Sequence, residues 1–511
     1  MARKPRVVDS IARGDGTVGI GPRLRRQHVT HRFEPVGDII GRLSVVFGAS
    51  MLLPALLDYG DGNENWYGTV IAAFLTMAAG AALAQANTGA RDRGLSRQQA
   101  FLLTVLIWVV GPTLGALPFV FGTISASYTD GFFEAMSGLT TTGASVFTGL
   151  EEAPRGMLLW RAMMQWYGGL GIVIVAMVFL PAMKIGGMQF FQSEAFDVSG
   201  DILPRASEIA RHLIWIYLAL TLGCFVGYAA VGMNPFEALC QTLSTVSTGG
   251  YGTRDTSFAE FPPGAQWVGI VFMCLAAWPF VRFIQLGRGN TRGLVRDSQI
   301  RAFMVIILAV SGAIAAWLVV YAGATPMEAA RESLFNVTSL ITGTGFATGD
   351  YNSWGGFPVA LFLILPMIGG CAGSTSCSAK VFRYQILLET LRGQLGRMRS
   401  PHGVFTLRYQ GRPVEPDVVS SIMAFFFVFL CSLGIWAILL TMMGLDFVTA
   451  LSGSIATLCN SGPGLGPIIG PVGSFQALSD AAKWLLSAGM LLGRLEFLSV
   501  LVLLTPVFWR R

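Results

Sequence analysis

Hydrophobic residues form long blocks from about residue 36 to residue 508, and short polar connections separate the blocks. About ten blocks reach the roughly 20 residues that an α-helix needs to cross a bilayer core about 30 Å thick. Blocks of this length predict transmembrane helices, and their number predicts a polytopic protein. We therefore expect an all-α polytopic membrane fold and not a β-barrel.

Four shorter segments interrupt this pattern. Each lies between two long blocks, is too short to cross the membrane and ends in small polar residues. They are "DGFFEAMSGLTTTGAS" (130–145), "NPFEALCQTLSTVSTGGYG" (234–252), "TPMEAARESLFNVTSLITGTGFA" (325–347) and "LDFVTALSGSIATLCNSGPGLG" (445–466). Four such segments indicate an internal repeat. The glycines that align best are Gly143, Gly249, Gly345 and Gly462, separated by 106, 96 and 117 residues (249−143, 345−249, 462−345).

The polar ends of these segments predict an ion-conducting passage. Bare backbone N–H and C=O groups in lipid cost several kcal/mol each, so extended backbone at membrane depth must be surrounded by protein or line a wet cavity. Glycine allows a loop to turn its carbonyl groups inward, and serine and threonine add oxygens without charge. Four such loops around one axis would replace the water shell of a monovalent cation. The alternative is that small residues only allow close helix packing.

Composition and charge narrow the functional classes. Hydrophobic residues make up 53% of the 511 residues and charged residues 13%, so a soluble fold could not bury the apolar blocks. The net charge of +6 would suit nucleic acid, but the positive residues concentrate in short connections between blocks, as the positive-inside rule describes. We expect no nucleic-acid partner, both termini in the cytoplasm, and residues 1–35 as a basic cytoplasmic arm.

Catalytic and metal-binding motifs are sparse. The seven cysteines form no CxxC pair, and the four histidines fall in basic or cytoplasmic-looking stretches. No GxxxxGK[ST] sequence occurs, and no histidine or paired acidic motif lies at membrane depth. An enzyme is therefore not expected. A secondary transporter with a buried carboxylate relay is the other competing class, but the acidic residues cluster at predicted outer mouths and helix starts.

Acidic residues occur near the N-terminal ends of the short segments: Glu134, Glu237, and Glu328 or Glu332. The helix dipole favours carboxylates at these positions. The same residues also predict an electronegative outer vestibule that concentrates cations.

Three further stretches accompany the repeats: "QWYGGLGIVIVAMVFLPAMKIGGMQ" (165–189), "GGCAGSTSCSAK" (369–380) and "GRLEFLSVLVLL" (493–504). Together with the four short segments, they resemble the Trk/Ktr/HKT superfamily of potassium transport proteins, specifically its bacterial TrkH-type members. The resemblance implies four M1–pore-helix–M2 repeats in a pseudo-fourfold arrangement around one pore. The implied units are an extra N-terminal helix pair (36–90) and pore repeats at 91–190, 200–290, 296–395 and 413–511.

The resemblance also implies a potassium-binding selectivity filter made by the backbone of four loops. Its residues would be Thr141, Thr142, Gly143 and Ala144; Ser247, Thr248, Gly249 and Gly250; Gly343, Thr344, Gly345 and Phe346; and Asn460, Ser461, Gly462 and Pro463. In this superfamily a serine in place of the first filter glycine accompanies sodium transport. All four glycines are present here, which favours potassium.

A run of eleven small residues, 369–379, lies midway through the second span of the third repeat and predicts an intramembrane loop below the filter. In the TrkH-type resemblance this loop is the gate, and Arg494 lies in the cavity under the filter and limits the leak of cations. The predicted gate residues are Gly369, Gly370, Gly373, Ser374, Thr375, Lys380 and Arg494. The alternatives are a helix packed through small residues, a salt bridge from Arg494 to another span, and an interfacial, snorkelling Lys380.

The resemblance further implies a homodimer in the bacterial inner membrane and a cytoplasmic ring of nucleotide-binding, TrkA-like regulatory subunits. The basic connections 287–301 and 383–412 are candidate docking surfaces for that ring. Potassium is the expected transported ligand, membrane lipid surrounds the chain, and no covalent or enzymatic cofactor is expected. A proton- or sodium-coupled potassium symporter is the alternative mechanism.

Overall fold

The structure is a computed structural model, and it describes residues 33–90, 95–179, 187, 206–403 and 405–509. The predicted basic arm, 1–35, therefore lies almost wholly outside the described residues. The described chain consists of helices and loops, with one short hairpin in which β1 (Arg408–Tyr409) pairs with β2 (Arg412–Pro413). The expected all-α membrane fold is confirmed.

Seven helical stretches among the described residues are long and apolar enough to cross a membrane, and one bent pair is an eighth candidate. The seven are α2 with α3 (Glu34–Ser50 and Leu52–Gly60), α4 (Asn65–Ala86), α5 with α6 (Arg97–Gly115 and Leu117–Phe121), α8 (Arg155–Ile174) with its π-helical continuation (Val175–Phe179), α11 (Ala206–Ala230), α16 (Ser298–Tyr321) and α20 (Pro416–Met442). The bent pair is α13 (Pro263–Ala276) and α14 (Phe280–Gly287).

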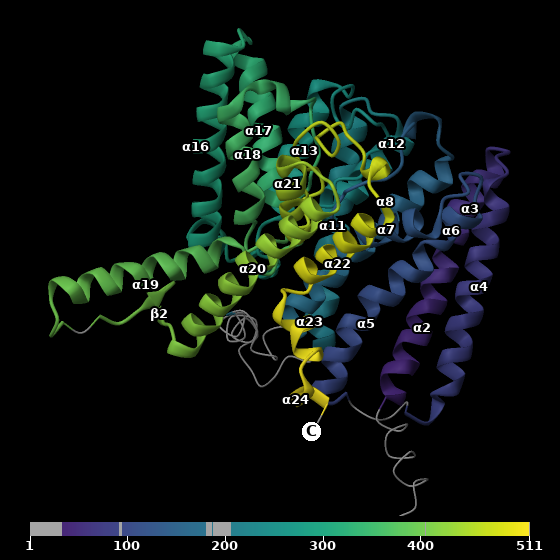
Figure 1. The fold of residues 1–511 in the computed structure, drawn as a ribbon, viewed down its shortest axis with the longest axis horizontal. Helices are drawn as coiled ribbons and strands as arrows, with labels where there is room; N and C mark the ends of the chain where they lie inside the picture. Colours follow the sequence, from purple (N-terminus) through teal and green to yellow (C-terminus); the bar gives the residue numbers. More distant parts are fainter. Residues whose placement is uncertain (1–32, 91–94, 180–186, 188–205, 404, 510–511) are drawn as a thin grey trace, which may run out of the picture.

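The N-terminal pair, α2 and α4, packs through small residues. A Cβ added to Gly41 would lie 2.6 Å from the Gly80 carbonyl oxygen, and one added to Gly80 would lie 2.6 Å from that of Gly41. Close approach through small residues is a common packing mode of membrane helices. Figure 1 shows this pair at one side of the molecule and α16 at the opposite side.

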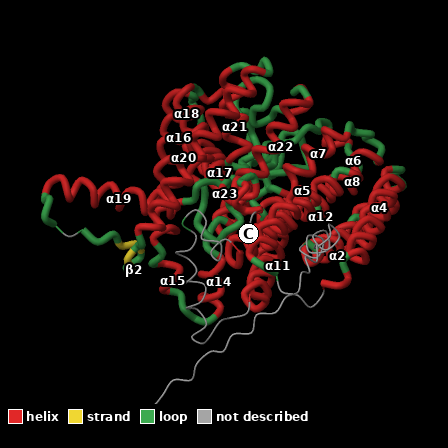
Figure 2. Tube along the Cα trace, turned by 60° about the horizontal axis from the view of Figure 1, so that its bottom comes forward, coloured by secondary structure: helices red, strands yellow, loops and turns green. Residues whose placement is uncertain are grey.

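Each of the four repeats contains one short helix between its long ones: α7 (Tyr128–Leu139), α12 (Pro235–Val246), α17 (Pro326–Thr342) and α21 (Phe447–Leu458). Each begins after a residue whose side chain accepts a hydrogen bond from a backbone N–H of the first turn: Ser127, Asn234, Thr325 and Asp446. Such N-caps typically stabilise a helix start by about 1 kcal/mol. Figure 2 shows loop segments gathered among α7, α17, α21 and α22 (Asp480–Arg494).

The second long segment of every repeat departs from a regular α-helix. In the first repeat α8 continues as a π-helix. In the second, α13 and α14 form a 90° bend, and Pro279, which has no backbone N–H to donate, lies in the break between them. In the third, α18 (Gly356–Ile368) and α19 (Val381–Arg399) are separated by a non-helical loop, 369–380. In the fourth, α22 ends at Arg494 and a short helix, α23 (Leu498–Leu503), follows; α24 (Pro506–Trp509) ends the described chain.

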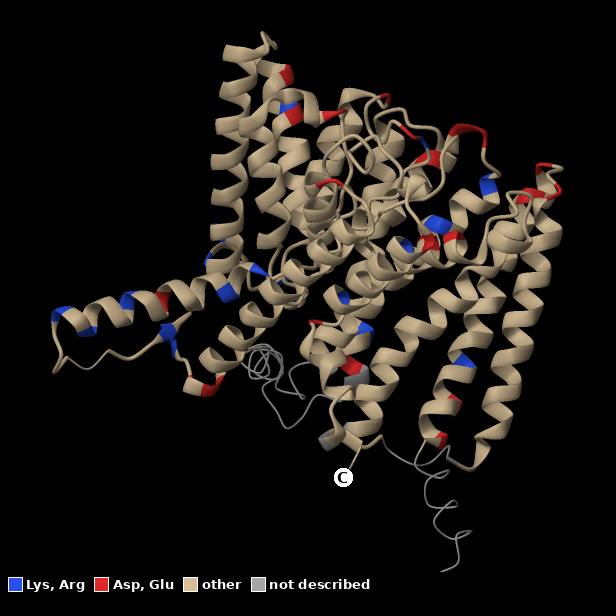
Figure 3. Ribbon diagram, viewed as in Figure 1, with Lys and Arg blue, Asp and Glu red and all other residues tan. Residues whose placement is uncertain are grey.

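Charged side chains distribute unevenly over the two ends of the spans. Acidic residues gather in the loops at the end where the short helices begin (Figure 3). At the other end, α19 extends sideways from the bundle and carries Arg383, Arg392, Arg397 and Arg399 (Figure 3). This asymmetry matches the sequence-based expectation that one end of the bundle is basic.

Candidate functional site

The four short helices end in the same backbone arrangement. In each repeat a loop N–H donates to the carbonyl five positions earlier, at 2.8 Å: Thr142 to Ser137, Gly249 to Ser244, Thr344 to Ser339, and Ser461 to Ala456. The residue before each donor has a φ of 51–75°, and the residue after it is a glycine with a φ of 84–87°. This shared geometry fixes the register of the repeats. We call residues 141–144, 248–251, 343–346 and 460–463 the ring loops.

The register corrects one sequence-based expectation. The glycine equivalent to Gly143, Gly345 and Gly462 is Gly250, and not Gly249. The window predicted for the second repeat, 247–250, is therefore one residue early, and its structural counterpart is 248–251. Sequence alone could not separate the two adjacent glycines, because both are small and both follow the same short helix.

The four equivalent glycines close a ring. A Cβ added to Gly143 would lie 2.3 Å from the Gly249 carbonyl oxygen. The corresponding contacts are Gly250 to the Thr344 oxygen (1.9 Å), Gly345 to the Ser461 oxygen (2.4 Å) and Gly462 to the Thr142 oxygen (2.6 Å). Each glycine thus abuts the loop of the next repeat, and the fourth abuts the first. Glycine is required here twice over, by the positive φ and by the space.

The ring loops present carbonyl oxygens that lack protein partners. In each repeat we count three carbonyl groups, those of the ring glycine and of the two residues before it, which makes twelve in all. Within the described residues, eleven of these oxygens accept no hydrogen bond from the protein. The exception is Gly249, whose oxygen accepts from Gln165 Nε2 at 2.6 Å. Unpaired buried carbonyl groups are rare in proteins because they lose their water partners without replacement. A row of such oxygens suits a cation that has shed its water.

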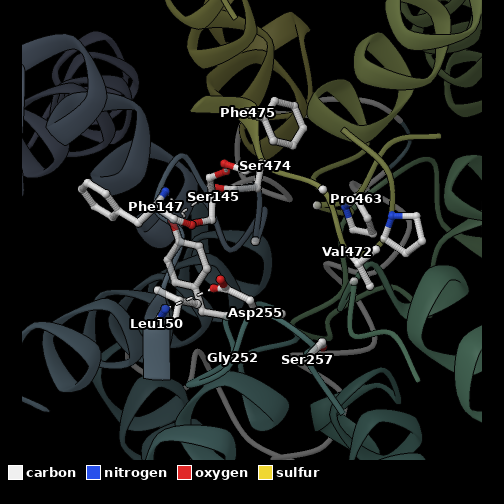
Figure 4. A pocket seen from close by; sticks show the side chains of 18 of the residues that line it. Ser145, Phe147, Leu150, Gly252, Asp255, Ser257, Pro463, Val472, Ser474 and Phe475 are labelled. Carbon is white, nitrogen blue, oxygen red and sulfur yellow. Dashed lines mark hydrogen bonds between the residues drawn. The ribbon is translucent and has the colours of Figure 1, made fainter. Parts of the chain in front are cut away.

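A pocket opens onto this ring. All four ring glycines line it, together with Ser145, Asp255, Pro463 and Phe475 from the surrounding loops (Figure 4). Asp255 is fixed by the first repeat, because its carboxylate accepts hydrogen bonds from the N–H groups of Gly149 (2.6 Å) and Leu150 (3.2 Å). The four short helices also direct their C-terminal, partially negative ends at the ring loops that follow them. Both features favour a cation at the ring.

The structure places two of the predicted vestibule carboxylates, Glu134 and Glu237, in ion pairs outside the pocket. Glu134 is fully buried behind the first ring loop, where it pairs with Arg161 at 2.7 Å. Glu237 pairs with Arg254 at 2.9 Å, and this hydrogen bond to Glu237 raises the pKa of the Arg254 guanidinium. Neither glutamate lines the pocket, whereas Arg161 and Arg254 do. The carboxylate that lines it, Asp255, lies in the loop after the second ring loop.

Two buried residues of α8, Arg161 and Gln165, stabilise the ring loops and are not among the residues predicted from sequence. Arg161 donates to the Gly252 carbonyl oxygen (3.0 Å) and to Ser145 Oγ (3.0 Å), and its guanidinium lies 4.1 Å from the centre of the Tyr251 ring. Gln165 contacts the second ring loop. The sequence does carry a signal for Arg161, because it is a charged residue inside an apolar block, as Arg494 is.

The loop 369–380 lies directly beneath the ring loops. Thr375 Oγ1 is 3.3 Å from Thr248 Oγ1, so the loop touches the second ring loop. Backbone bonds attach it to the break in the second repeat, with Cys371 N–H donating to the Ala277 oxygen (3.0 Å) and Phe280 N–H to the Gly373 oxygen (2.9 Å). The loop is not a helix packed through small residues.

The small residues of this loop have specific tasks. Gly369 and Gly373 have φ of 77° and 70°, and a Cβ added to Gly373 would lie 2.6 Å from the sulfur of Met177 in the π-helix of the first repeat. The N–H of Gly370 donates to Ser376 Oγ at 2.9 Å, and Ser374 Oγ donates to the Cys371 oxygen at 2.7 Å. The loop is therefore packed against neighbouring repeats and folded on itself.

Arg494 joins three repeats at this level. It ends α22 of the fourth repeat, and its guanidinium donates to the Gly168 oxygen of the first repeat at 2.9 Å. The same group donates to the Thr375 oxygen at 3.4 Å and contacts the Cys377 thiol, both in the loop of the third repeat. Among the described residues no carboxylate lies within 4.0 Å of this guanidinium. The fully buried charge is thus held by carbonyl oxygens and a sulfur.

Lys380 is buried and paired, and does not snorkel. Its ammonium group lies 3.5 Å from the carboxylate of Glu496, which also bonds Arg383. Glu496 follows Arg494 by two positions but turns to these two cations of the third repeat. The predicted gate residues are therefore brought together below the ring loops, with Lys380 at the edge of the group.

Comparison with known proteins places the chain among relatives. The family TrkH, described as "Cation transport protein", matches residues 68–510. The chain is 38% identical over 482 residues to the Trk system potassium uptake protein TrkI of Halomonas elongata, covering 94% of this chain and 98% of that protein. It is 33% identical over 489 residues to TrkH of Escherichia coli K12, covering 94% and 99%. The crystal structure of the potassium transporter TrkH from Vibrio parahaemolyticus matches with a TM-score of 0.86 at 34% identity, covering 94% of this chain and 100% of that one.

Proposed function

The chain belongs to the TrkH family of cation transport proteins, and from this membership we propose that it carries potassium ions into the cell across the bacterial plasma membrane. Its relatives are named Trk system potassium uptake proteins. The observation that carries the proposal is the closed ring of four glycines with eleven unpartnered carbonyl oxygens around it. Such oxygens can take the place of water around a monovalent cation.

In this proposal the ring loops are the selectivity filter. The ion would pass in single file from the pocket that Asp255 lines, between the four backbones. A full ring of glycines favours potassium, because a side chain at any of the four positions would fill the space facing the next loop's carbonyl oxygen. The proposed binding residues are Thr141 to Ala144, Thr248 to Tyr251, Gly343 to Phe346, and Asn460 to Pro463.

We propose that the loop 369–380, held by Arg494, is the gate. The loop and the guanidinium lie below the ring loops, and a fixed positive charge there raises the energy of a passing cation. Opening requires the loop to move away from Thr248 and Arg494, and the loop is non-helical and rich in small residues. In the proposal, gating is a switch between this packed position of the loop and a displaced one.

Assembly and orientation belong to the same proposal. We expect a homodimer, a cytoplasmic ring of nucleotide-binding regulatory subunits, and both termini in the cytoplasm. Support comes from the arginines of α19 at one end of the bundle, which agree with the positive-inside rule. No enzymatic activity and no cofactor are proposed, and potassium is substrate.

The test is ion flux into liposomes that contain only this purified chain, with sodium as competitor and with pH varied on each side. Passive potassium flux that outpaces sodium and ignores a pH gradient supports a channel. Flux that needs a proton gradient, or that moves potassium against its own gradient, would establish coupled transport. Equal flux of both cations would contradict the proposed filter.

A further inference from the structure

We infer that Gln165, on α8 of the first repeat, is a positioning residue that sets the ion selectivity of the second ring loop. The inference rests on the proposed function. Gln165 is fully buried, and its side-chain amide reaches across from the first repeat to the second. It therefore acts on the passage through the backbone it holds.

Three hydrogen bonds fix the amide. Its Nε2 donates to the Gly249 carbonyl oxygen at 2.6 Å, and its Oε1 accepts from Ser244 Oγ at 2.5 Å and from the Tyr251 N–H at 3.1 Å. The donor and acceptor assignments agree with one another, because only the NH₂ group can serve a carbonyl and only the oxygen can accept from an N–H. A buried amide with three such bonds is held in one orientation.

The amide also occupies a space that side chains fill in the other repeats. Gly249 is equivalent to Thr142, Thr344 and Ser461, and a Cβ added to it would lie 2.4 Å from Cδ and 2.5 Å from Oε1 of Gln165. This explains the pair of adjacent glycines in the second ring loop. Gly250 is glycine because of the ring, and Gly249 is glycine because Gln165 takes the place of its side chain.

The arrangement makes this loop dependent on its neighbour. Two consecutive glycines are the most flexible backbone a loop can have, so Gly249 and Gly250 need an external tie to hold one conformation. The Gly249 oxygen abuts Gly143, and among the twelve carbonyl oxygens counted above it is the one that accepts a hydrogen bond from the described residues. Without the tie, the ring can relax around an ion of another size, and the preference for potassium over sodium falls.

The experiment measures potassium and sodium flux in liposomes for Gln165→Leu and Gln165→Glu. Both variants remove the donor to Gly249, one with an apolar group of similar size and one with a carboxylate. The matched control is Gln266→Leu, because Gln266 is also a buried glutamine, on α13, and its amide donates to the Phe258 oxygen at 3.4 Å, outside the ring loops. A third variant, Gln165→Gly with Gly249→Thr, also removes the Gln165 Cβ, which would lie 2.9 Å from a Cβ at position 249. It rebuilds in the second repeat the threonine found at this position in the first and third.

The expected result is a potassium-to-sodium flux ratio at least about fivefold lower in both Gln165 variants, the scale of one lost hydrogen bond. The Gln266 variant should keep the ratio, and the double variant should recover part of it. A Gln165 variant that lowers both fluxes equally, at an unchanged ratio, would overturn the inference. If the unmodified chain itself shows no preference for potassium, the proposed function fails instead. If Gln165→Leu does not fold, Gln165→Glu and the double variant decide.

Discussion

The ammonium group of Lys380 lies 3.5 Å from the carboxylate of Glu496, and both side chains are buried. The pair joins the end of the loop 369–380 to the break that follows α22. Both residues of the pair and two neighbours, Ser378 and Phe497, have φ between 49° and 70°. Such conformations cost non-glycine residues about 1–3 kcal/mol each and persist only where other contacts enforce them. The ion pair therefore holds two strained segments together.

Replacing Lys380 with methionine should increase potassium flux. The substitution removes one of the ties between the loop and the fourth repeat, while Arg494 keeps its bond to Thr375 and Glu496 keeps its bond to Arg383. Flux of the purified chain into liposomes measures the effect. Arg392→Ala is the control, because Arg392 is a well-exposed cation on α19 that pairs within its own helix. Unchanged flux in Lys380→Met would show that this pair does not hold the loop closed.

Replacing Arg494 with alanine should raise potassium flux by about tenfold or more, which corresponds to about 1.4 kcal/mol off the barrier. The substitution removes both a buried positive charge and the donors to Gly168 and Thr375. Arg494→Lys keeps the charge with fewer donors, so its potassium flux should fall between those of the unmodified chain and Arg494→Ala. Arg42→Ala, which removes a half-exposed arginine from α2, controls for a general effect of lost charge. Equal flux in all four proteins would remove Arg494 from the gate.

Replacing Gly143 with serine should admit sodium. The new Cβ would lie 2.3 Å from the Gly249 carbonyl oxygen, so the ring must shift. The sodium-to-potassium flux ratio measures the outcome. Gly232→Ser is a matched control for backbone strain, because Gly232 has a φ of 88° but nothing within 4 Å of an added Cβ. If both variants behave alike, strain and not ring geometry is responsible.

The ring glycines of three repeats were predictable from sequence, because a glycine that follows a short helix and hydroxyl residues has few other uses at membrane depth. The second repeat was not, since Gly249 and Gly250 differ in backbone conformation and in contacts, which the sequence does not show. The break at Pro279 was also predictable, because a proline inside an apolar block interrupts a helix. The break at Glu496 and Phe497 was not predictable, because both residue types are common in helices and adopt positive φ only under tertiary constraint.

Breaking the buried pair of Arg161 and Glu134 should destabilise the fold. Replacing Arg161 with methionine leaves the carboxylate buried without its partner, which typically costs about 3–5 kcal/mol. Thermal unfolding in detergent measures the loss. Arg155→Ala is the comparison, because Arg155 pairs with Asp61 at 3.0 Å while half exposed, and exposed pairs contribute about 0–1 kcal/mol. Equal losses would show that burial does not decide the strength of these pairs.

Removing potassium should lower the unfolding temperature more than removing sodium does. Binding at the unpartnered carbonyls stabilises only the folded chain, by about 2.7 kcal/mol at a potassium concentration one hundred times the Kd. Melting curves in potassium, sodium and choline chloride at equal ionic strength measure the difference. Identical curves in all three salts would mean that the folded chain binds no potassium at the ring.

The ring of Gly143, Gly250, Gly345 and Gly462 has a consequence for how the protein can vary. Where a ring is built from four identical subunits, one altered codon changes all four walls of the passage at once. Here the four loops are four different segments of one chain, so each can change independently of the others. A mutation can therefore change one wall of the passage and leave the other three unchanged. The second repeat is an example, because Gly249 replaces the threonine or serine of the other repeats and Gln165 fills the space of the missing side chain.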